Sequence, residues 1–86
     1  MKPEKLKKLG ALAGCEVGGV FGNPRLARAV AGDLMARIRL RADLFAEAVR
    51  IGEGERAPEE QMRPLREKRD ETAAALAEAL ALVEGE

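Results

Sequence analysis

Two stretches of the chain, residues 24–52 and 58–84, carry apolar residues at alternating steps of three and four. This spacing is typical of an amphipathic helix that packs in a coiled coil. The two apolar stripes match when they run antiparallel: Ala27 meets Val83, Leu34 meets Leu76, and Phe45 meets Leu65. The pattern therefore predicts a helical hairpin that turns near residue 55.

Residues 3–13 read as a short basic helix, because Pro3 suits a first helical turn and leucines follow at steps of three. Residues 14–22 form a Gly-rich connection that has two interpretations. Glycines four residues apart would allow close helix packing, but each helical Gly costs about 0.8–1 kcal/mol relative to Ala. We therefore expect a loop whose apolar residues fold back onto the hairpin: Val17, Val20 and Phe21.

The long helix has a clear start and two candidate stops. Asn23 is a good N-cap, Pro24 suits the first helical position, and Gly52 and Gly54 favour an end. The closing helix contains Pro64, which removes a hydrogen bond and clashes with the preceding turn. Two outcomes stay open there: a kinked helix, or a helix that begins near Met62.

A second apolar edge lies on the long helix, beside the stripe that faces the hairpin partner. We call it the aliphatic edge, and its members are Leu26, Leu40, Leu44 and Ile51. Asp33 and Arg37 share this edge. One hairpin partner cannot cover both edges, so the second edge is expected to meet the N-terminal segment or another chain.

Composition supports an all-α fold in a single small domain. The 86 residues include 16 Ala, 11 Leu, 12 Glu and 10 Arg, whereas only five Val and two Ile favour strands. A chain of this length buries roughly 60–65% of its unfolded surface, so oligomerisation would be a natural supplement.

The missing residue types limit the chemistry. The chain has no His, Ser or Tyr and a single Cys, Cys15. Nucleophilic catalysis by Ser–His or Cys–His pairs and zinc sites built on Cys or His are therefore excluded. Carboxylates, Lys and Arg remain capable of acid–base work, but we expect a non-catalytic protein without a cofactor or metal. One Cys permits no internal disulfide and gives no evidence of an oxidising compartment. No targeting or transmembrane segment is convincing, which leaves the cytoplasm as the expected compartment.

Formal charge is zero but unevenly spread. Residues 23–52 carry a net +3 and residues 57–86 a net −4, which favours antiparallel pairing of the two helices.

Arg41 and Arg69 occupy positions in the two stripes that would face each other. Together they form a candidate site for a carboxylate or phosphate. The alternative is that each extends to the edge of the stripe and pairs with a nearby acid.

Four arginines fall within a narrow sector of the outer face of the long helix: Arg25, Arg28, Arg39 and Arg50. Such a row could track nucleic-acid phosphates. Asp43 shares the sector, and the chain has no Trp or Tyr for base stacking. A solvated face with local ion pairs is the alternative.

The segment Leu12-Ala13-Gly14-Cys15 follows several lysines and resembles the lipobox of bacterial lipoproteins. The resemblance covers only the first fifteen residues, and the apolar stretch before Cys15 is shorter than in a usual signal peptide. It implies a lipid attached to Cys15 and a membrane anchor. Without lipidation, the same residues form a small helix beside an inert Cys, and no membrane contact is expected.

The leading hypothesis is a helical protein–protein interaction or oligomerisation module. Its partner would be a second copy of the chain or another helical protein. The expected interface is the aliphatic edge, extended by Val20 and Phe21 where these are exposed. Nucleic-acid binding through the outer arginines and a lipid-anchored protein are the alternatives.

Overall fold

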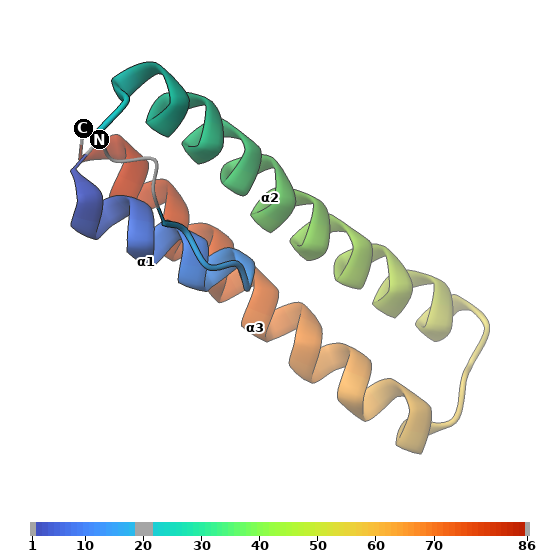
Figure 1. Ribbon diagram of the computed structural model, residues 1–86. Coiled ribbons are helices and arrows are strands. Elements are labelled where there is room, and N and C mark those ends of the chain that lie inside the picture. The colour runs from blue at the N-terminus through green and yellow to red at the C-terminus, as the bar shows by residue number, and fades with distance from the viewer. Residues whose placement is uncertain (1, 19–21, 86) are drawn as a thin grey trace.

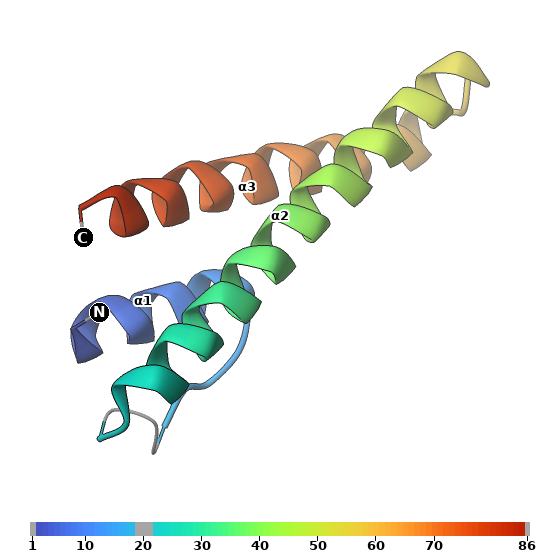
Figure 2. The same ribbon diagram turned by 90° about the horizontal axis from the view of Figure 1, so that it is seen from above.

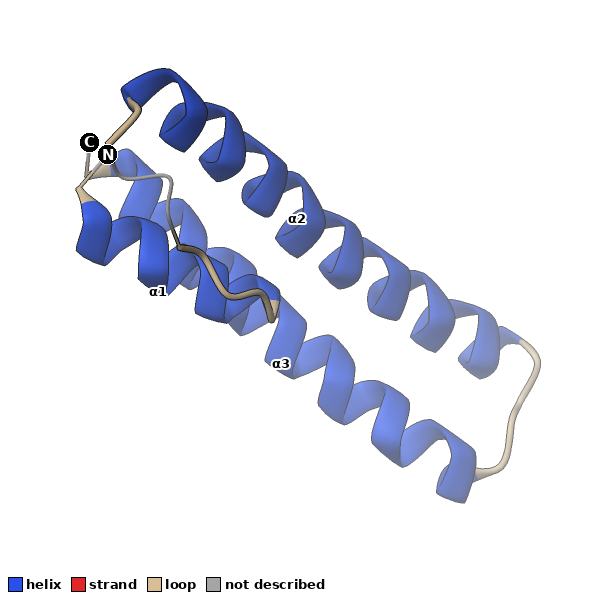
Figure 3. Ribbon diagram, viewed as in Figure 1, coloured by secondary structure: helices blue, strands red, loops and turns tan. Residues whose placement is uncertain are grey.

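The computed structural model describes residues 2–18 and 22–85 and is helical throughout its regular parts (Figures 1 and 3). It contains α1 (Pro3–Ala13), α2 (Pro24–Gly54) and α3 (Glu59–Glu84), and the described residues include no strand. The all-α prediction is confirmed.

Helices α2 and α3 run in opposite directions (Figure 1). They lie close together near their connection and diverge toward the other end of the molecule (Figure 2). Helix α1 packs against both of them at the end of the molecule where α2 begins and α3 ends (Figures 1 and 2). The result is an elongated body of 50 × 22 × 16 Å. One half therefore has three helices, and the other half, near the α2–α3 connection, has two.

Helix α1 contributes two of the largest buried side chains of the three-helix half. Leu6 and Leu9 are fully buried against small residues of the longer helices, among them Ala27, Ala31 and Ala79. Burial of a leucine side chain contributes about 1.5–3 kcal/mol, so these two residues anchor α1. Four further residues are buried outside this cluster: Ala42, Val49, Met62 and Thr72.

The start of α2 follows from its cap. The side-chain oxygen of Asn23 accepts a hydrogen bond of 3.1 Å from the backbone N–H of Leu26, and Pro24 opens the helix. The helix does not stop at Gly52 but continues to Gly54. Gly52 has a packing role instead, because a Cβ there would overlap the sulfur of Met62.

Helix α3 begins at Glu59, directly after Pro58, and includes Pro64. A start near Met62 is therefore wrong, because the turn that opens at Pro58 continues into the helix. The carbonyl of Pro58 accepts hydrogen bonds from Gln61 and Met62, at 2.9 and 3.1 Å. The helix continues through Pro64, which has no N–H to donate to the carbonyl of Glu60.

Arg66 forms ion pairs on both sides of the α2–α3 connection. Its guanidinium lies 2.7 Å from the carboxylate of Glu59 and 3.5 Å from that of Glu53, at the end of α2. The hydrogen bond with Glu59 is the main cause that raises the pKa of Arg66. One side chain thus links the end of α2 with the first turns of α3.

The chain leaves α1 through Gly14, whose φ of 73° is the left-handed conformation that favours glycine. The segment 15–18 then turns back over α1, and the Cys15 N–H donates to the carbonyl of Gly10 at 2.8 Å. Gly10 permits this close approach, because a Cβ there would lie 2.6 Å from Val17 Cγ2. Val17 is half-buried against the core, while Val20 and Phe21 lie outside the described residues.

Candidate interaction surface

The large aliphatic side chains exposed on the described surface all belong to α2. Their exposed fractions are 46% for Leu26, 58% for Leu40, 57% for Leu44 and 48% for Ile51. Because α2 turns about 100° per residue, these positions fall on one edge of the helix. The aliphatic edge is thus covered by neither α1 nor α3.

The opposite side of α2 explains why this edge stays uncovered. Residues of the predicted stripe face α1 and α3 and are buried, among them Ala31, Leu34 and Ile38. Ala42 and Val49 extend that buried side into the two-helix half. The two neighbours of α2 therefore both lie on one side of it.

A pair of opposite charges interrupts the aliphatic edge. The Nε of Arg37 donates to Asp33 Oδ2 at 3.1 Å, one helical turn away, and both side chains are more than half exposed. Arg37 also approaches the segment after α1, since its Nη1 lies 3.6 Å from the sulfur of Cys15. Neither charge is buried, so both remain accessible to a partner.

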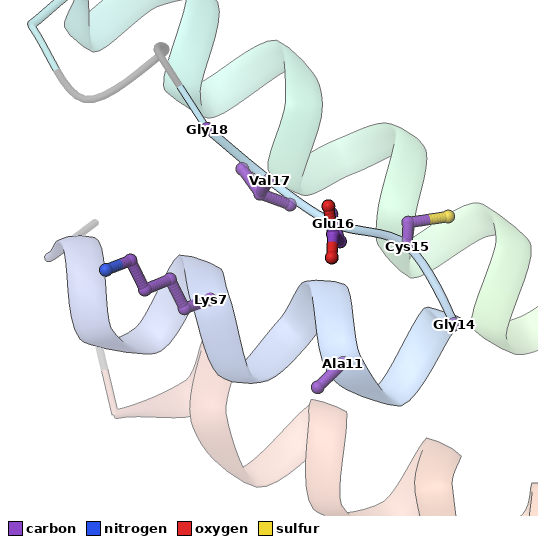
Figure 4. Close-up of a pocket in the computed structure, with 7 residues that line it drawn as sticks. All are labelled: Lys7, Ala11, Gly14, Cys15, Glu16, Val17 and Gly18. Atoms are coloured by element: carbon purple, nitrogen blue, oxygen red, sulfur yellow. The ribbon is translucent and has the colours of Figure 1, made fainter.

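Two shallow hollows flank the segment 14–18. One, of about 220 Å³, lies between this segment and α2 and includes Val30, Asp33 and Arg37 in its wall. The other, of about 530 Å³, opens over α1 and includes Lys7, Ala11 and Glu16 (Figure 4). The Cys15 side chain borders both, points toward α2 and is half-buried (Figure 4).

Arg41 and Arg69, the candidate anion site, have different nearest groups. Arg41 is half-buried beside the end of α1, where its Nη1 lies 3.8 Å from the position a Cβ on Gly14 would take. The Nε of Arg69 donates to its neighbour Asp70 at 3.1 Å. Within residues 2–18 and 22–85, the two guanidinium groups share no hydrogen-bond partner.

The four outer arginines are all exposed: Arg25, Arg28, Arg39 and Arg50. Arg50 is engaged locally, because its Nε donates to Glu47 at 3.2 Å and its Nη2 pairs with the same carboxylate. This hydrogen bond, with the attraction between the charges, lowers the pKa of Glu47 and raises that of Arg50. One of the four outer arginines, Arg50, therefore already has its charge neutralised by a carboxylate of the same helix.

Further chemistry is sparse in the described part of the chain. No group of three His, Cys, Asp or Glu side chains there is placed to hold a metal ion. Likewise, none of the described helices combines the length and apolarity that a membrane span requires. No charged residue in this part of the chain is buried, and several form short-range pairs on the surface.

Sequence reasoning missed the contacts that depend on the path of the chain between helices. Examples are the approach of Arg37 to Cys15 and the link from Arg66 to Glu53. The glycines at positions 10 and 14 were the available signal, because they allow the chain to turn back over α1.

Comparison of the chain with known protein families, curated proteins and solved structures gives no match.

Proposed function

We propose that this chain is a non-catalytic helical interaction module. In this proposal the antiparallel pair α2–α3 is the scaffold, and the aliphatic edge is the surface that binds a helical partner or a further copy. The supporting observation is that four large aliphatic side chains are about half exposed along one edge of α2.

The energetics favour covering this edge. Burial of apolar surface contributes about 25 cal/mol per Å², and a fully buried Leu or Ile contributes about 1.5–3 kcal/mol. Because each of these side chains is about half exposed, full burial by a partner would add roughly half of that contribution, or about 1 kcal/mol per side chain. Exposed aliphatic residues that share one edge of a helix are typical of helix-on-helix recognition.

Nucleic-acid binding through the outer arginines is less favoured by the charges. Arg50 pairs with Glu47, and the whole chain carries a formal net charge of zero. A nucleic-acid-binding surface usually combines several unpaired cations with an overall basic character.

Size-exclusion chromatography with light scattering and detection at 260 nm tests the proposal. We expect the wild-type protein to form a complex, with itself or with a helical protein purified alongside it, that Leu44→Glu disrupts while helicity is retained. Ala46→Glu is the matched control, because it adds the same charge to an exposed position on another side of α2.

Two results would contradict the proposal. The first is a complex that survives Leu44→Glu as well as it survives Ala46→Glu, because the edge would then not be the interface. The second is a strong 260 nm absorbance that disappears in Arg39→Glu, which would favour nucleic-acid binding.

A further inference from the structure

We infer that the partner of the aliphatic edge is a second copy of this chain, with the two α2 helices antiparallel. This inference rests on the proposed function and names the partner that the edge would bind. The two-fold axis would pass between Asp33 and Arg37 of each copy.

The geometry starts from a continuous stripe along the exposed side of α2. From Leu26 to Leu44 its members follow at alternating steps of four and three: Leu26, Val30, Asp33, Arg37, Leu40 and Leu44. This is the spacing of the contact positions in a coiled coil. Val30 is half-buried, and the other members are exposed.

Charge order selects the antiparallel direction. In a parallel pair each residue faces its own copy, so Asp33 would meet Asp33 and Arg37 would meet Arg37. In the antiparallel pair, Asp33 of one copy faces Arg37 of the other, and the symmetry repeats this attraction on the far side of the axis. Like charges in direct opposition disfavour the parallel form.

The same register also matches the apolar residues. Leu26 faces Leu44 of the second copy, and Val30 faces its Leu40. Every member of the stripe between residues 26 and 44 therefore faces either another aliphatic residue or a residue of opposite charge. One stripe is complementary to itself, which a two-fold interface requires.

Other antiparallel registers fit less well. A shift of one heptad places Asp33 opposite Leu44 and Arg37 opposite Leu40, which would bury both charges against leucine. A shift of two heptads pairs Leu40 with Leu44 and Arg37 with Glu47. That register places Asp33 opposite Ile51 and competes with the existing pair of Glu47 and Arg50.

The two charges are available for this role. Asp33 and Arg37 pair within their own helix at 3.1 Å, and their side chains are 64% and 59% exposed. In the dimer, the four charges of two copies would form one network around the axis, so neither carboxylate would lose its internal partner. Networks of this kind fix direction and register in paired helices.

Charge reversal in two separate variants tests the register. Asp33→Arg gives two cations on the stripe, and Arg37→Asp gives two anions. We expect the wild type to elute as a dimer and each variant alone to dimerise at least tenfold more weakly. An equimolar mixture should regain a dimer within about threefold of wild-type affinity, because every cation then faces an anion.

The mixture is informative because neither variant can restore its own internal pair of Asp33 and Arg37. Recovery would therefore come only from contacts between chains. Arg39→Asp and Asp43→Arg are matched controls, since they reverse exposed charges of the same types on the outer face of α2. We expect both controls to dimerise as the wild type does.

The outcomes separate this inference from the proposed function. A wild-type dimer that Leu44→Glu disrupts, but whose charge variants do not recover on mixing, overturns this register and leaves the edge as an interface. A monomeric wild type at hundreds of micromolar overturns the second copy as partner and leaves a foreign helical protein. A dimer that survives Leu44→Glu contradicts both proposals.

Discussion

The thioether of Met62 lies directly against Gly52 across the connection between α2 and α3. A Cβ on Gly52 would overlap the sulfur of Met62 and lie 3.0 Å from its terminal methyl group. Met62 is only 1% exposed, so the sulfur has little free space into which it can move. The glycine thus permits close packing at the narrow end of the molecule.

Gly52→Ala is expected to lower the free energy of unfolding by about 1 kcal/mol. Overpacking against Met62 costs roughly 1–3 kcal/mol, which outweighs the helix-propensity gain of about 0.8–1 kcal/mol from Ala. In a Met62→Val background the overlapping atoms are gone, so the same change should stabilise by about 0.8–1 kcal/mol. Urea denaturation followed by circular dichroism checks both. An equal effect in the two backgrounds would contradict the packing explanation.

Pro64→Ala is expected to raise the free energy of unfolding by about 2 kcal/mol. Proline inside a helix costs about 3 kcal/mol relative to Ala, and its stiffening of the unfolded chain returns about 0.4–1 kcal/mol. Pro64 is exposed, so the change removes no buried contact. Thermal and urea unfolding measure the gain, and Arg63→Ala, at the adjacent exposed position, should stay within about 0.5 kcal/mol. A destabilising Pro64→Ala would show that the proline fixes a needed bend.

The helices of this protein follow from local signals. The Asn23–Pro24 pair supplies the cap and first turn of α2, and the heptad spacing identifies the side that α1 and α3 bury. Position 52 shows the limit of such reasoning. A glycine in a helical sequence usually signals an end, and its contact with Met62 depends on how α3 folds back.

The same limit applies to the candidate surface. Helical spacing alone places Leu40 and Leu44 on one edge, and the structure leaves both exposed. The contact of Arg37 with Cys15 depends on the path of residues 14–18, which follows from tertiary packing rather than periodicity. What binds to the edge stays a prediction, because a single chain shows only the uncovered surface.

Gly14→Ala should destabilise the protein by about 1 kcal/mol. Gly14 has a φ of 73°, a conformation that costs other residues roughly 1–2 kcal/mol, and its N–H donates to the carbonyl of Ala11 at 3.1 Å. Gly14→Asn should cost less, because Asn tolerates this conformation better than Ala. Gly18→Ala is the matched control: no atom lies within 4 Å of its Cβ position. Equal losses at positions 14 and 18, measured by urea denaturation, would contradict the conformational explanation.

The pKa of Glu47 is expected to lie below the usual glutamate value of about 4.3. The hydrogen bond from Arg50 is the main cause, and the attraction between their charges adds to it. A carboxyl whose folded pKa is lowered stabilises the fold fully above its unfolded pKa, and this contribution is lost as the pH falls through the folded value. Titration of the Glu47 side-chain carbon by NMR measures the shift directly. Because both side chains are exposed, salt should reduce it.

Arg50→Gln should return the pKa of Glu47 toward its ordinary value, because both causes of the shift come from the Arg50 guanidinium. Arg39→Gln is the matched control: it also removes one exposed arginine from the outer face of α2, but it leaves the Arg50 pair intact. A lowered pKa that persists in Arg50→Gln would mean that another cation holds the carboxylate. In the dimer register shifted by two heptads, that cation would be Arg37 of the second copy. The titration of the Arg50→Gln variant, repeated above and below the dimerisation concentration, would then distinguish that register from the one centred between Asp33 and Arg37.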